Sequence, residues 1–260
     1  MFFGKKSDEI DFSIGITTFE SRFETYFKPL VNRIRSYDRK SEIVVAVNGE
    51  HNKPMDDNYR SRVLAFAAAH EKVYPIIFPV FRGLSKLWNT ILIHAVSNYV
   101  LMLNDDVMID RPDLMQVLNK KLARNRNRSF LINASWSHCL LNREEMEEIG
   151  YFDERLLGIG EEDGDMTWRY IRKYGKPLTN YSIKGIINYS EETMAEKPIN
   201  IRCREGSKYS RFNRNFMFET KYRADENGIK GMFDRPMVLR DAGPEQYANE
   251  RFYRERRNEL

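Results

Sequence analysis

The chain has 260 residues, 42% of them hydrophobic and 31% charged, and this composition predicts a soluble globular protein with a sizeable core. Its 42 Lys and Arg residues nearly balance 38 Asp and Glu residues, and the net charge of +4 argues against a dedicated nucleic-acid-binding protein. The sequence has no signal-peptide pattern, no apolar run of the roughly 18 to 20 residues that span a membrane, and only two distant cysteines, so we expect a cytoplasmic protein.

The first 110 residues alternate between extended and helical patterns. Extended segments are predicted over residues 12–19, 42–49, 73–81 and 99–103. Apolar residues at helical spacing predict helices between them: one capped by Ser21 and kinked or delayed by Pro29, one over residues 60–70, and one capped by Ser85. This alternation predicts an α/β fold with a mostly parallel central sheet, right-handed crossovers and helices on both faces.

The chain continues with shorter elements. Helices are predicted after Pro112, over residues 143–149 and before Gly175, and strands over residues 129–136 and 178–189. Asn142 is the expected N-cap of the helix over residues 143–149, and Gly150 is expected to end it.

Two acidic residues end the most apolar stretch of the sequence. Tyr99 to Leu103 form an uninterrupted apolar run, which is typical of a strand buried on both faces, and Asp105 and Asp106 follow it. Ligands of open α/β sheets collect beyond the carboxyl ends of the strands. Adjacent carboxylates repel each other, so they favour a shared cation, most simply Mg²⁺ or Mn²⁺, which keeps coordination positions for substrate phosphates. The plainer alternative is that the pair begins a loop and caps the helix after Pro112.

A second acidic cluster, Glu161-Glu162-Asp163 with Asp165 beyond it, lies in a glycine-flanked loop just before a predicted helix. Acids are favourable at helix N-termini, so N-capping, expected above all of Asp165, is the plainer interpretation. Three acids in a row exceed what a cap requires, and a carboxylate facing a metal-bound phosphate is suited to take a proton from an attacking hydroxyl. The glycines before the cluster lack the third member of a dinucleotide fingerprint.

The order of these motifs resembles that of the family 2 inverting glycosyltransferases of the GT-A fold. The matching segments are a strand ending in Thr-Thr-Phe, a strand ending in Val-Asn-Gly, an Arg-Gly-Leu-x-x-x-x-Asn stretch, the apolar run into Asp-Asp and, most specifically, residues 149–154 leading to residues 162–166. The resemblance covers about residues 10–190. It implies a GT-A domain over residues 1–190 that binds a nucleotide sugar and carries out catalysis.

The resemblance implies donor-binding roles for residues at the ends of predicted elements. Thr17, Thr18 and Phe19 match the first-strand end that holds the base and ribose. Lys86 and Asn89 match the helix start that reaches toward the nucleotide.

Two asparagines stand where the family usually has an Asp. Asn48 replaces the acid that contacts the base, and an amide can still donate and accept hydrogen bonds toward uracil. Asn104-Asp105-Asp106 stands for the Asp-x-Asp motif. The resemblance thus makes Asp106 the main metal ligand, with Asp105 nearer to the ribose or the metal and Asn104 on the donor side.

The resemblance also assigns the reacting side of the site. Asp163 matches the catalytic base with Glu162 beside it, and Trp136 and His138 lie where the family shapes the acceptor and donor-sugar pocket. A lone histidine is more often structural, so a structural role for His138 stays open. No histidine follows His138, so the C-terminal histidine ligand of some GT-A enzymes is missing or replaced.

Together these features predict a hexosyltransferase-type enzyme that uses Mn²⁺ or Mg²⁺. It is expected to move a sugar, with inversion, from a nucleotide sugar, most simply a UDP-sugar, to a hydroxyl of a glycan or lipid-linked glycan. Family analogy suggests surface-polysaccharide synthesis. Two alternatives stay open: a sugar nucleotidyltransferase, whose glycine-rich N-terminal phosphate loop is absent here, and a non-catalytic glycan- or nucleotide-binding module.

Residues 191–260 are expected to form a C-terminal extension. Basic and aromatic residues interleave in it from Arg202 to Phe216. This segment has three interpretations: a lid over the donor diphosphate, a contact with an anionic lipid-linked acceptor or with the inner face of the membrane, or a solvated surface.

Overall fold

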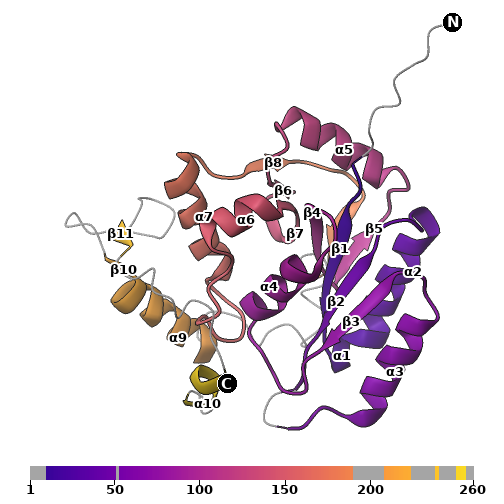
Figure 1. Ribbon diagram of the computed structural model, residues 1–260, viewed down its shortest axis with the longest axis horizontal. Helices are drawn as coiled ribbons and strands as arrows, with labels where there is room; N and C mark the ends of the chain where they lie inside the picture. Colours follow the sequence, from indigo (N-terminus) through magenta and orange to yellow (C-terminus); the bar gives the residue numbers. More distant parts are fainter. Residues whose placement is uncertain (1–9, 51–52, 190–207, 224–237, 240–249, 256–260) are drawn as a thin grey trace, which may run out of the picture.

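A central sheet of seven strands organises the protein (Figure 1). The computed structural model describes residues 10–50, 53–189, 208–223, 238–239 and 250–255. The strands of the sheet are β1 (Ser13–Thr18), β2 (Ile43–Val47), β3 (Val73–Ile77), β4 (Tyr99–Asn104), β6 (Phe130–Ile132), β7 (Ser135–Asn142) and β8 (Thr179–Tyr181). They lie in the order β3-β2-β1-β4-β7-β6-β8, and only β7 runs antiparallel to its neighbours in the sheet. The predicted α/β class with a mostly parallel sheet is confirmed.

Helices pack around this sheet and a few short elements extend it. The helices of the first 190 residues are α1 (Glu20–Arg22), the π-helix η1 (Phe23–Phe27), α2 (Lys28–Tyr37), α3 (Asp57–Ala68), α4 (Leu84–His94), α5 (Leu114–Arg124), α6 (Arg143–Ile149) and α7 (Glu162–Tyr174). The remaining elements are β5 (Val107–Ile109), β9 (Ile186–Asn188), α9 (Lys208–Asn215), the π-helix η3 (Phe216–Lys221), β10 (Tyr222–Arg223), β11 (Val238–Leu239) and α10 (Glu250–Glu255).

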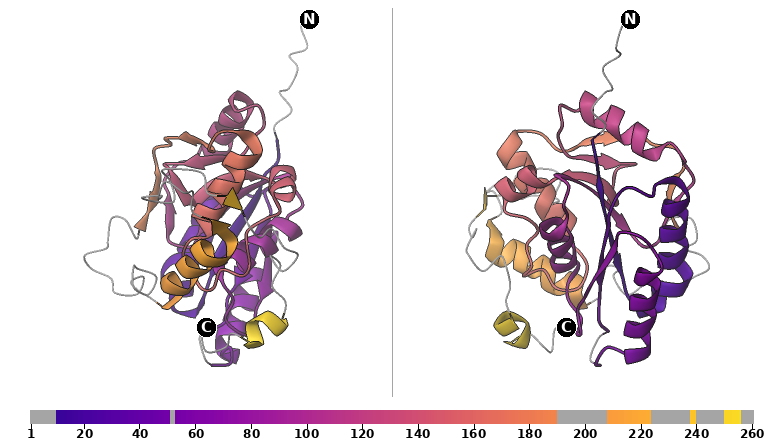
Figure 2. Two further views of the ribbon diagram at one scale, coloured as in Figure 1. Left: turned by 90° about the vertical axis from the view of Figure 1, so that its left-hand side faces the viewer. Right: turned by 45° about the vertical axis from the view of Figure 1, so that its right-hand side comes forward.

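The two faces of the sheet are buried by different helices (Figure 2). Ile14 and Ile16 of β1 point to the face that α2, α3 and α5 cover, whereas Met102 of β4 points to the face that α4, α6 and α7 cover. Such double coverage is the physical reason for apolar runs without alternation. Gly15 lets α4 approach the sheet closely, because a Cβ at this position would overlap Cγ2 of Ile91.

The helices that follow β1 and β3 begin earlier than predicted. Phe19 is the N-cap of α1 and Gly83 is the N-cap of α4, so Ser21 and Ser85 lie inside these helices and the predicted serine caps are wrong. Pro29, which has no N–H to donate, lies in the first turn of α2 directly after η1. The wider π-helical turn of η1 thus accommodates the backbone hydrogen bond that Pro29 cannot make.

The segment predicted as one strand over residues 129–136 is two strands joined by a tight turn. Asn133 and Ala134 have positive φ angles of 52° and 58°, and they reverse the chain from β6 into β7. Asn is common in this left-handed conformation but Ala is not, so only one of the two turn residues is of a type that predicts a hairpin turn. The reversal makes β7 antiparallel to β4 and places His138 opposite Leu103.

The segment predicted as a strand over residues 178–189 also divides in two. Gly185, with a φ angle of 82°, lies in the turn between β8 and β9. β9 leaves the central sheet and pairs antiparallel with β5, and the N–H of Tyr189 donates to the carbonyl oxygen of Asp106 at 2.8 Å. This small sheet fixes the backbone just after the acidic pair.

α9 packs on the loop that precedes α7. Nδ2 of Asn213 donates to the carbonyl oxygens of Leu157 and Gly160 at 2.8 Å each, and its Oδ1 accepts the N–H of Leu157 at 2.7 Å. The ring of Tyr209 lies so close to Gly158 that a Cβ there would overlap it. The C-terminal segment therefore fixes the shape of this loop.

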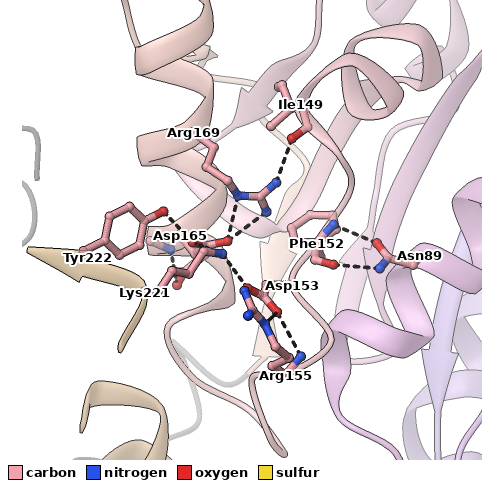
Figure 3. A network of polar contacts seen from close by, with 11 residues as sticks. Asn89, Ile149, Phe152, Asp153, Arg155, Asp165, Arg169, Lys221 and Tyr222 are labelled. Carbon is pink, nitrogen blue, oxygen red and sulfur yellow. Dashed lines mark hydrogen bonds and ion pairs between the residues drawn. The ribbon is translucent and has the colours of Figure 1, made fainter. Parts of the chain in front are cut away.

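A buried ionic network joins the same segment to α7 (Figure 3). Nζ of Lys221 lies 2.6 Å from Oδ2 of Asp153 and 2.6 Å from Oδ1 of Asp165. Asp153 also pairs with Arg155, and Asp165 pairs with Arg169, at 2.8 Å each. These side chains are at most 6% exposed, so each charge depends on the others for compensation.

The predicted boundary at residue 190 stays a prediction, because residues 190–207 lie outside the described part of the chain. Of the basic and aromatic segment from Arg202 to Phe216, only the part from residue 208 onward is described, and it forms α9 and the start of η3. None of the helices in the described ranges combines the length and the apolar character needed to cross a bilayer.

We expect Lys221→Met to lower the free energy of unfolding by about 3–5 kcal/mol, because it leaves two buried carboxylates short of one cation. Urea unfolding measures this loss. Lys173→Met is the matched control: Nζ of Lys173 lies 3.6 Å from Glu148, and these side chains are 48% and 55% exposed. Such a surface pair contributes less than about 1 kcal/mol. Equal losses in the two variants would show that the buried network does not hold the C-terminal segment.

Candidate functional site

The carboxyl ends of β1 and β4 meet at one edge of the sheet. Thr17 pairs with Asn104 in their parallel register, and Thr18 is the last residue of β1. Asp105 and Asp106 follow β4 directly and therefore lie at the edge where open α/β sheets bind ligands. The structure thus brings these five predicted residues together.

A buried arginine bridges the acidic pair. Asp105 and Asp106 are each 3% exposed, and Nη2 of Arg22 lies 2.7 Å from Oδ1 of Asp105 and 2.6 Å from Oδ2 of Asp106. Burial raises the pKa of Asp105 to about 7, a shift that Arg22 opposes and Asp106 increases. The guanidinium lies 5.5 Å from the ring centroid of Phe19 and 5.3 Å from that of Tyr26. Phe19, predicted to hold the base, therefore contacts Arg22.

Four oxygens at this edge have no hydrogen-bond partner among the described residues: Oγ1 of Thr18, Oδ1 of Asn104, Oδ2 of Asp105 and Oδ1 of Asp106. Leaving a buried polar atom unsatisfied costs about 1–3 kcal/mol, so the arrangement favours a ligand that supplies positive charge. Carboxylate and amide oxygens suit Mg²⁺ and Mn²⁺. The described residues hold no group of three or more His, Cys, Asp or Glu that could bind a metal, so the amide, substrate phosphates and water would complete the coordination.

His138 faces the same edge from β7. It is 2% exposed, and neither ring nitrogen has a hydrogen-bond partner in the described ranges. Burial lowers the pKa of His138 to about 4, against the opposing charge of Asp106. The imidazole is therefore neutral near pH 7, and a bound ligand would satisfy its nitrogens.

Trp136, the other residue predicted for the sugar pocket, packs in the core. Its ring lies 5.8 Å from that of Phe152 in an edge-to-face arrangement, and Phe152 also contacts Trp88 at 4.9 Å. Trp136 is 9% exposed. These contacts give it a structural role, and its contact with a sugar stays a prediction.

Asn48 uses its amide on the protein itself. Nδ2 donates to the carbonyl oxygen of Arg82 at 2.8 Å, and Oδ1 accepts the N–H of Arg82 at 2.9 Å. The backbone N–H of Asn48 donates to the carbonyl oxygen of Thr18 at 2.8 Å. A carboxylate could accept from Arg82 but could not donate to it, which gives a structural reason for Asn at this position. The contact with the base stays a prediction.

Lys86 and Asn89 of α4 hold the segment from Phe152 to Glu154. Nδ2 of Asn89 donates to the carbonyl oxygen of Phe152 at 2.8 Å, and its Oδ1 accepts the N–H of Phe152 at 2.9 Å (Figure 3). Nδ2 of Asn89 also donates to Oε1 of Glu154 at 3.0 Å. Nζ of Lys86 lies 3.1 Å from Oε2 of Glu154. Both residues thus tie α4 to the segment leading to the second acidic cluster, and their contact with a nucleotide stays a prediction.

α7 begins within the second acidic cluster. Glu161 is its N-cap with a φ angle of 72°, and Glu162 and Asp163 lie in the first turn. Glu162 is 6% exposed and accepts the N–H of Gly160 at 2.6 Å, and its burial and the charge of Asp163 raise its pKa to about 8. Asp163 is exposed, and its Oδ1 accepts the N–H of Gly164 at 2.7 Å. The turn therefore presents an exposed carboxylate beside one that is mostly protonated at pH 7.

Asp165 is not the N-cap that the sequence predicts. A cap precedes its helix, and α7 begins three residues before Asp165. Its side chain is buried against Arg169, Lys221 and Tyr222, whose hydroxyl donates to Oδ1 at 2.6 Å. Burial would raise the pKa of Asp165, but the charges of Arg169 and Lys221 outweigh it and hold the pKa at about 2.

The second acidic cluster opens α7, which packs on the same face of the sheet as α4 and α6. No hydrogen bond or ion pair joins Asp163 to Asp105 or Asp106 in the part of the chain that the structure describes. A cavity of about 510 Å³ lies elsewhere, between the start of β1, the end of α2 and the start of α5, and none of the predicted site residues lines it.

Three residues that support the site in the structure were not predicted from the sequence: Arg22, Asn213 and Lys221. Arg22 lies in α1, directly after β1, and its contact with the acidic pair depends on the tertiary fold, which no local motif indicates. Asn213 contacts the loop before α7, and Lys221 contacts Asp153. Both residues lie in the C-terminal extension, whose basic and aromatic composition does not indicate these contacts.

Comparisons with solved structures agree with this architecture. The mannosyltransferase PcManGT from Pyrobaculum calidifontis, in complex with GDP-Man and Mn²⁺, matches with a TM-score of 0.53 and 16% identity, over 68% of this chain and 55% of that one. TarS from S. aureus matches with a TM-score of 0.52 and 17% identity, over 68% and 36% of the two chains. GalNAc-T7 with UDP, GalNAc and Mn²⁺ matches with a TM-score of 0.53 and 11% identity, over 69% and 45%. No protein-family model and no curated protein matches the sequence.

These three neighbours are glycosyltransferases with a GT-A-like fold. The match spans between 36% and 55% of their lengths. At such identities the likeness concerns the architecture, which is a mostly parallel sheet between two layers of helices. The chain has the GT-A fold.

Proposed function

We propose that this protein is a metal-dependent, inverting glycosyltransferase of the hexosyltransferase type, related to family 2, that moves a sugar from a nucleotide sugar to a hydroxyl of a glycan acceptor. The observation that carries the proposal is the buried pair Asp105 and Asp106, which directly follows β4 at the ligand-binding edge of a GT-A sheet. One oxygen of each carboxylate has no hydrogen-bond partner among the described residues. Solved neighbours support it, since they hold GDP-Man with Mn²⁺, UDP with GalNAc and Mn²⁺, or UDP.

The proposed donor is a UDP-sugar. Structures of two of the neighbours, TarS and GalNAc-T7, hold UDP. Thr17 and Thr18 end β1 beside the acidic pair and Phe19 follows them, so a base and ribose would meet small polar groups and one aromatic ring there.

Asp106 and Asp105 would hold Mn²⁺ or Mg²⁺, with the amide oxygen of Asn104 beside them. When bound, the ion neutralises the donor diphosphate and stabilises it as a leaving group. The protein's own contribution is burial of both carboxylates, because charges interact more strongly in a medium of low dielectric constant.

Asp163 is the proposed general base. It lies in the first turn of α7, where the helix dipole favours a carboxylate, and it is exposed to an incoming acceptor. Its neighbour Glu162 is mostly protonated at pH 7, which limits the repulsion between them. Asp163 takes the proton of the acceptor hydroxyl while the oxygen of that hydroxyl attacks the anomeric carbon, on the side opposite the leaving diphosphate. This single displacement inverts the configuration.

The proposed acceptor is a glycan or a lipid-linked glycan of surface-polysaccharide synthesis. His138, whose ring nitrogens lack partners among the described residues, borders the sugar pocket in this proposal, together with Trp136. The C-terminal extension would contribute to acceptor or inner-membrane contacts of a cytoplasmic enzyme. The packing of α9 on the loop before Asp163 supports a position of the extension near the acceptor.

Asp163→Asn should lower turnover about 100-fold or more while the affinity for the nucleotide sugar stays near that of the wild type, because the amide cannot accept the proton. Release of UDP from a UDP-sugar and acceptor measures turnover, and calorimetry measures affinity. Asp57→Asn, on the exposed face of α3, is the control and should be fully active. Wild-type turnover in Asp163→Asn would remove Asp163 as the base.

Asp106→Ala should abolish the part of UDP affinity that depends on Mn²⁺ and leave the metal-free affinity unchanged. The reason is that Asp106 is the main proposed ligand, while the strand ends that would hold the nucleoside stay intact. Calorimetric titration of UDP with and without Mn²⁺ tests this. Asp110→Ala removes a nearby exposed acid that pairs with Arg33 and is the matched control. The same dependence on Mn²⁺ in Asp106→Ala and wild type would refute the proposed metal site.

Glu162→Gln should leave stability unchanged near pH 5 and raise it above that of the wild type at pH 8. The pKa of Glu162 rises from 4.5 to about 8 on folding, so the wild type loses stability as the pH increases through this range. Gln keeps an acceptor for the N–H of Gly160 and carries no charge. Urea unfolding at about pH 5, 6.5 and 8 measures the difference. A difference that does not change with pH would contradict a buried neutral carboxyl group.

A further inference from the structure

Arg22 occupies the place at which two adjacent carboxylates would share a cation. Its Nη2 lies 2.7 Å from Asp105 and 2.6 Å from Asp106, and its side chain is 10% exposed. One nitrogen that contacts both carboxylates concentrates positive charge where a bound ion would. A Mg²⁺ ion on the same two oxygens would lie about 2.0–2.1 Å from each, which overlaps this nitrogen.

The acidic pair still has unused capacity. Each carboxylate gives one oxygen to Arg22, while Oδ2 of Asp105 and Oδ1 of Asp106 have no hydrogen-bond partner within the described ranges. A single positive charge thus faces two buried carboxylates, so one negative charge is left over when both are ionised. A divalent ion would balance the pair fully, which favours exchange of the arginine for the ion.

The surroundings of Arg22 are suited to an arginine that changes partners. Arg22 ends α1 and is the N-cap of η1, so it lies at a discontinuity of the helix rather than within a regular hydrogen-bond ladder. π-helical turns are frequent at functional sites. The rings of Phe19 and Tyr26, 5.5 and 5.3 Å away, stabilise a guanidinium without any carboxylate.

We propose that Arg22 is an internal competitor of the divalent ion: it pairs with Asp105 and Asp106 in the metal-free protein, which compensates part of their charge, and it leaves them when a divalent ion binds. This inference rests on the proposed metal site. It explains how the chain buries two adjacent carboxylates without a metal. It also requires that Arg22 lowers the affinity of the site for the ion.

Calorimetric titration with Mn²⁺ alone tests the competition. Arg22→Met removes the charge and keeps an unbranched apolar side chain, and it should bind Mn²⁺ at least about tenfold more tightly than the wild type, because no cation must leave. Arg33→Met is the matched control, since Arg33 pairs with the exposed Asp110, and it should bind like the wild type. Equal or weaker binding by Arg22→Met would overturn the competition.

Two further measurements separate the ways in which the inference can fail. Asp106→Ala should lose Mn²⁺ binding; if it keeps wild-type affinity, the ion binds elsewhere and the proposed metal site itself fails. If it loses binding but Arg22→Met gains none, only the competition fails.

Nuclear magnetic resonance of the wild type tests the inference without depending on the fold of Arg22→Met. The Nε–H signal of Arg22, assigned by its absence in Arg22→Lys, should show slow rotation of the guanidinium without metal and faster rotation in saturating Mg²⁺. An unchanged signal would overturn the exchange.

Discussion

Buried carboxylates that need compensating cations determine how this protein is built. An ionised carboxylate cannot remain in a core without a partner, since the desolvation cost is several kcal/mol per ion. Two ionic centres in the described residues show how the chain meets this constraint. Arg22 pairs with Asp105 and Asp106 beyond β4, and Lys221 lies between Asp153 and Asp165 beside α7. In both centres the cation comes from a part of the chain that is distant in sequence.

The two ionic centres differ in how completely they are satisfied. Asp165 pairs with Arg169, Lys221 and Tyr222, and these partners hold its pKa low, so that centre is a structural ion-pair network. The pair beyond β4 keeps oxygens without partners in the described residues, and burial raises the pKa of Asp105. The number of partners and the pKa of the carboxyl groups thus distinguish a structural ionic network from a site that favours a ligand, although both pair aspartates with basic side chains.

Features that depend on long sequence patterns were predictable, and features that depend on single side chains reaching across the fold were not. Apolar runs and helical spacing predict the sheet, its layers and the edge that carries the acidic pair, because double burial imposes them. The turn at Asn133 and Ala134 escapes prediction, since Ala has no preference for a positive φ angle. Arg22 and Lys221 escape it because only the tertiary path of the chain brings them to their carboxylates.

Lys221 follows Asp153 by 68 positions. On a growing polypeptide, α7 and its acids are synthesised well before the lysine that neutralises them. The nascent domain cannot close that part of its interior until Lys221 has been synthesised, so this folding step waits for the C-terminal segment. A chain truncated before α9 would keep the sequence of the central sheet, but the loop before α7 would lack the residues that fix it.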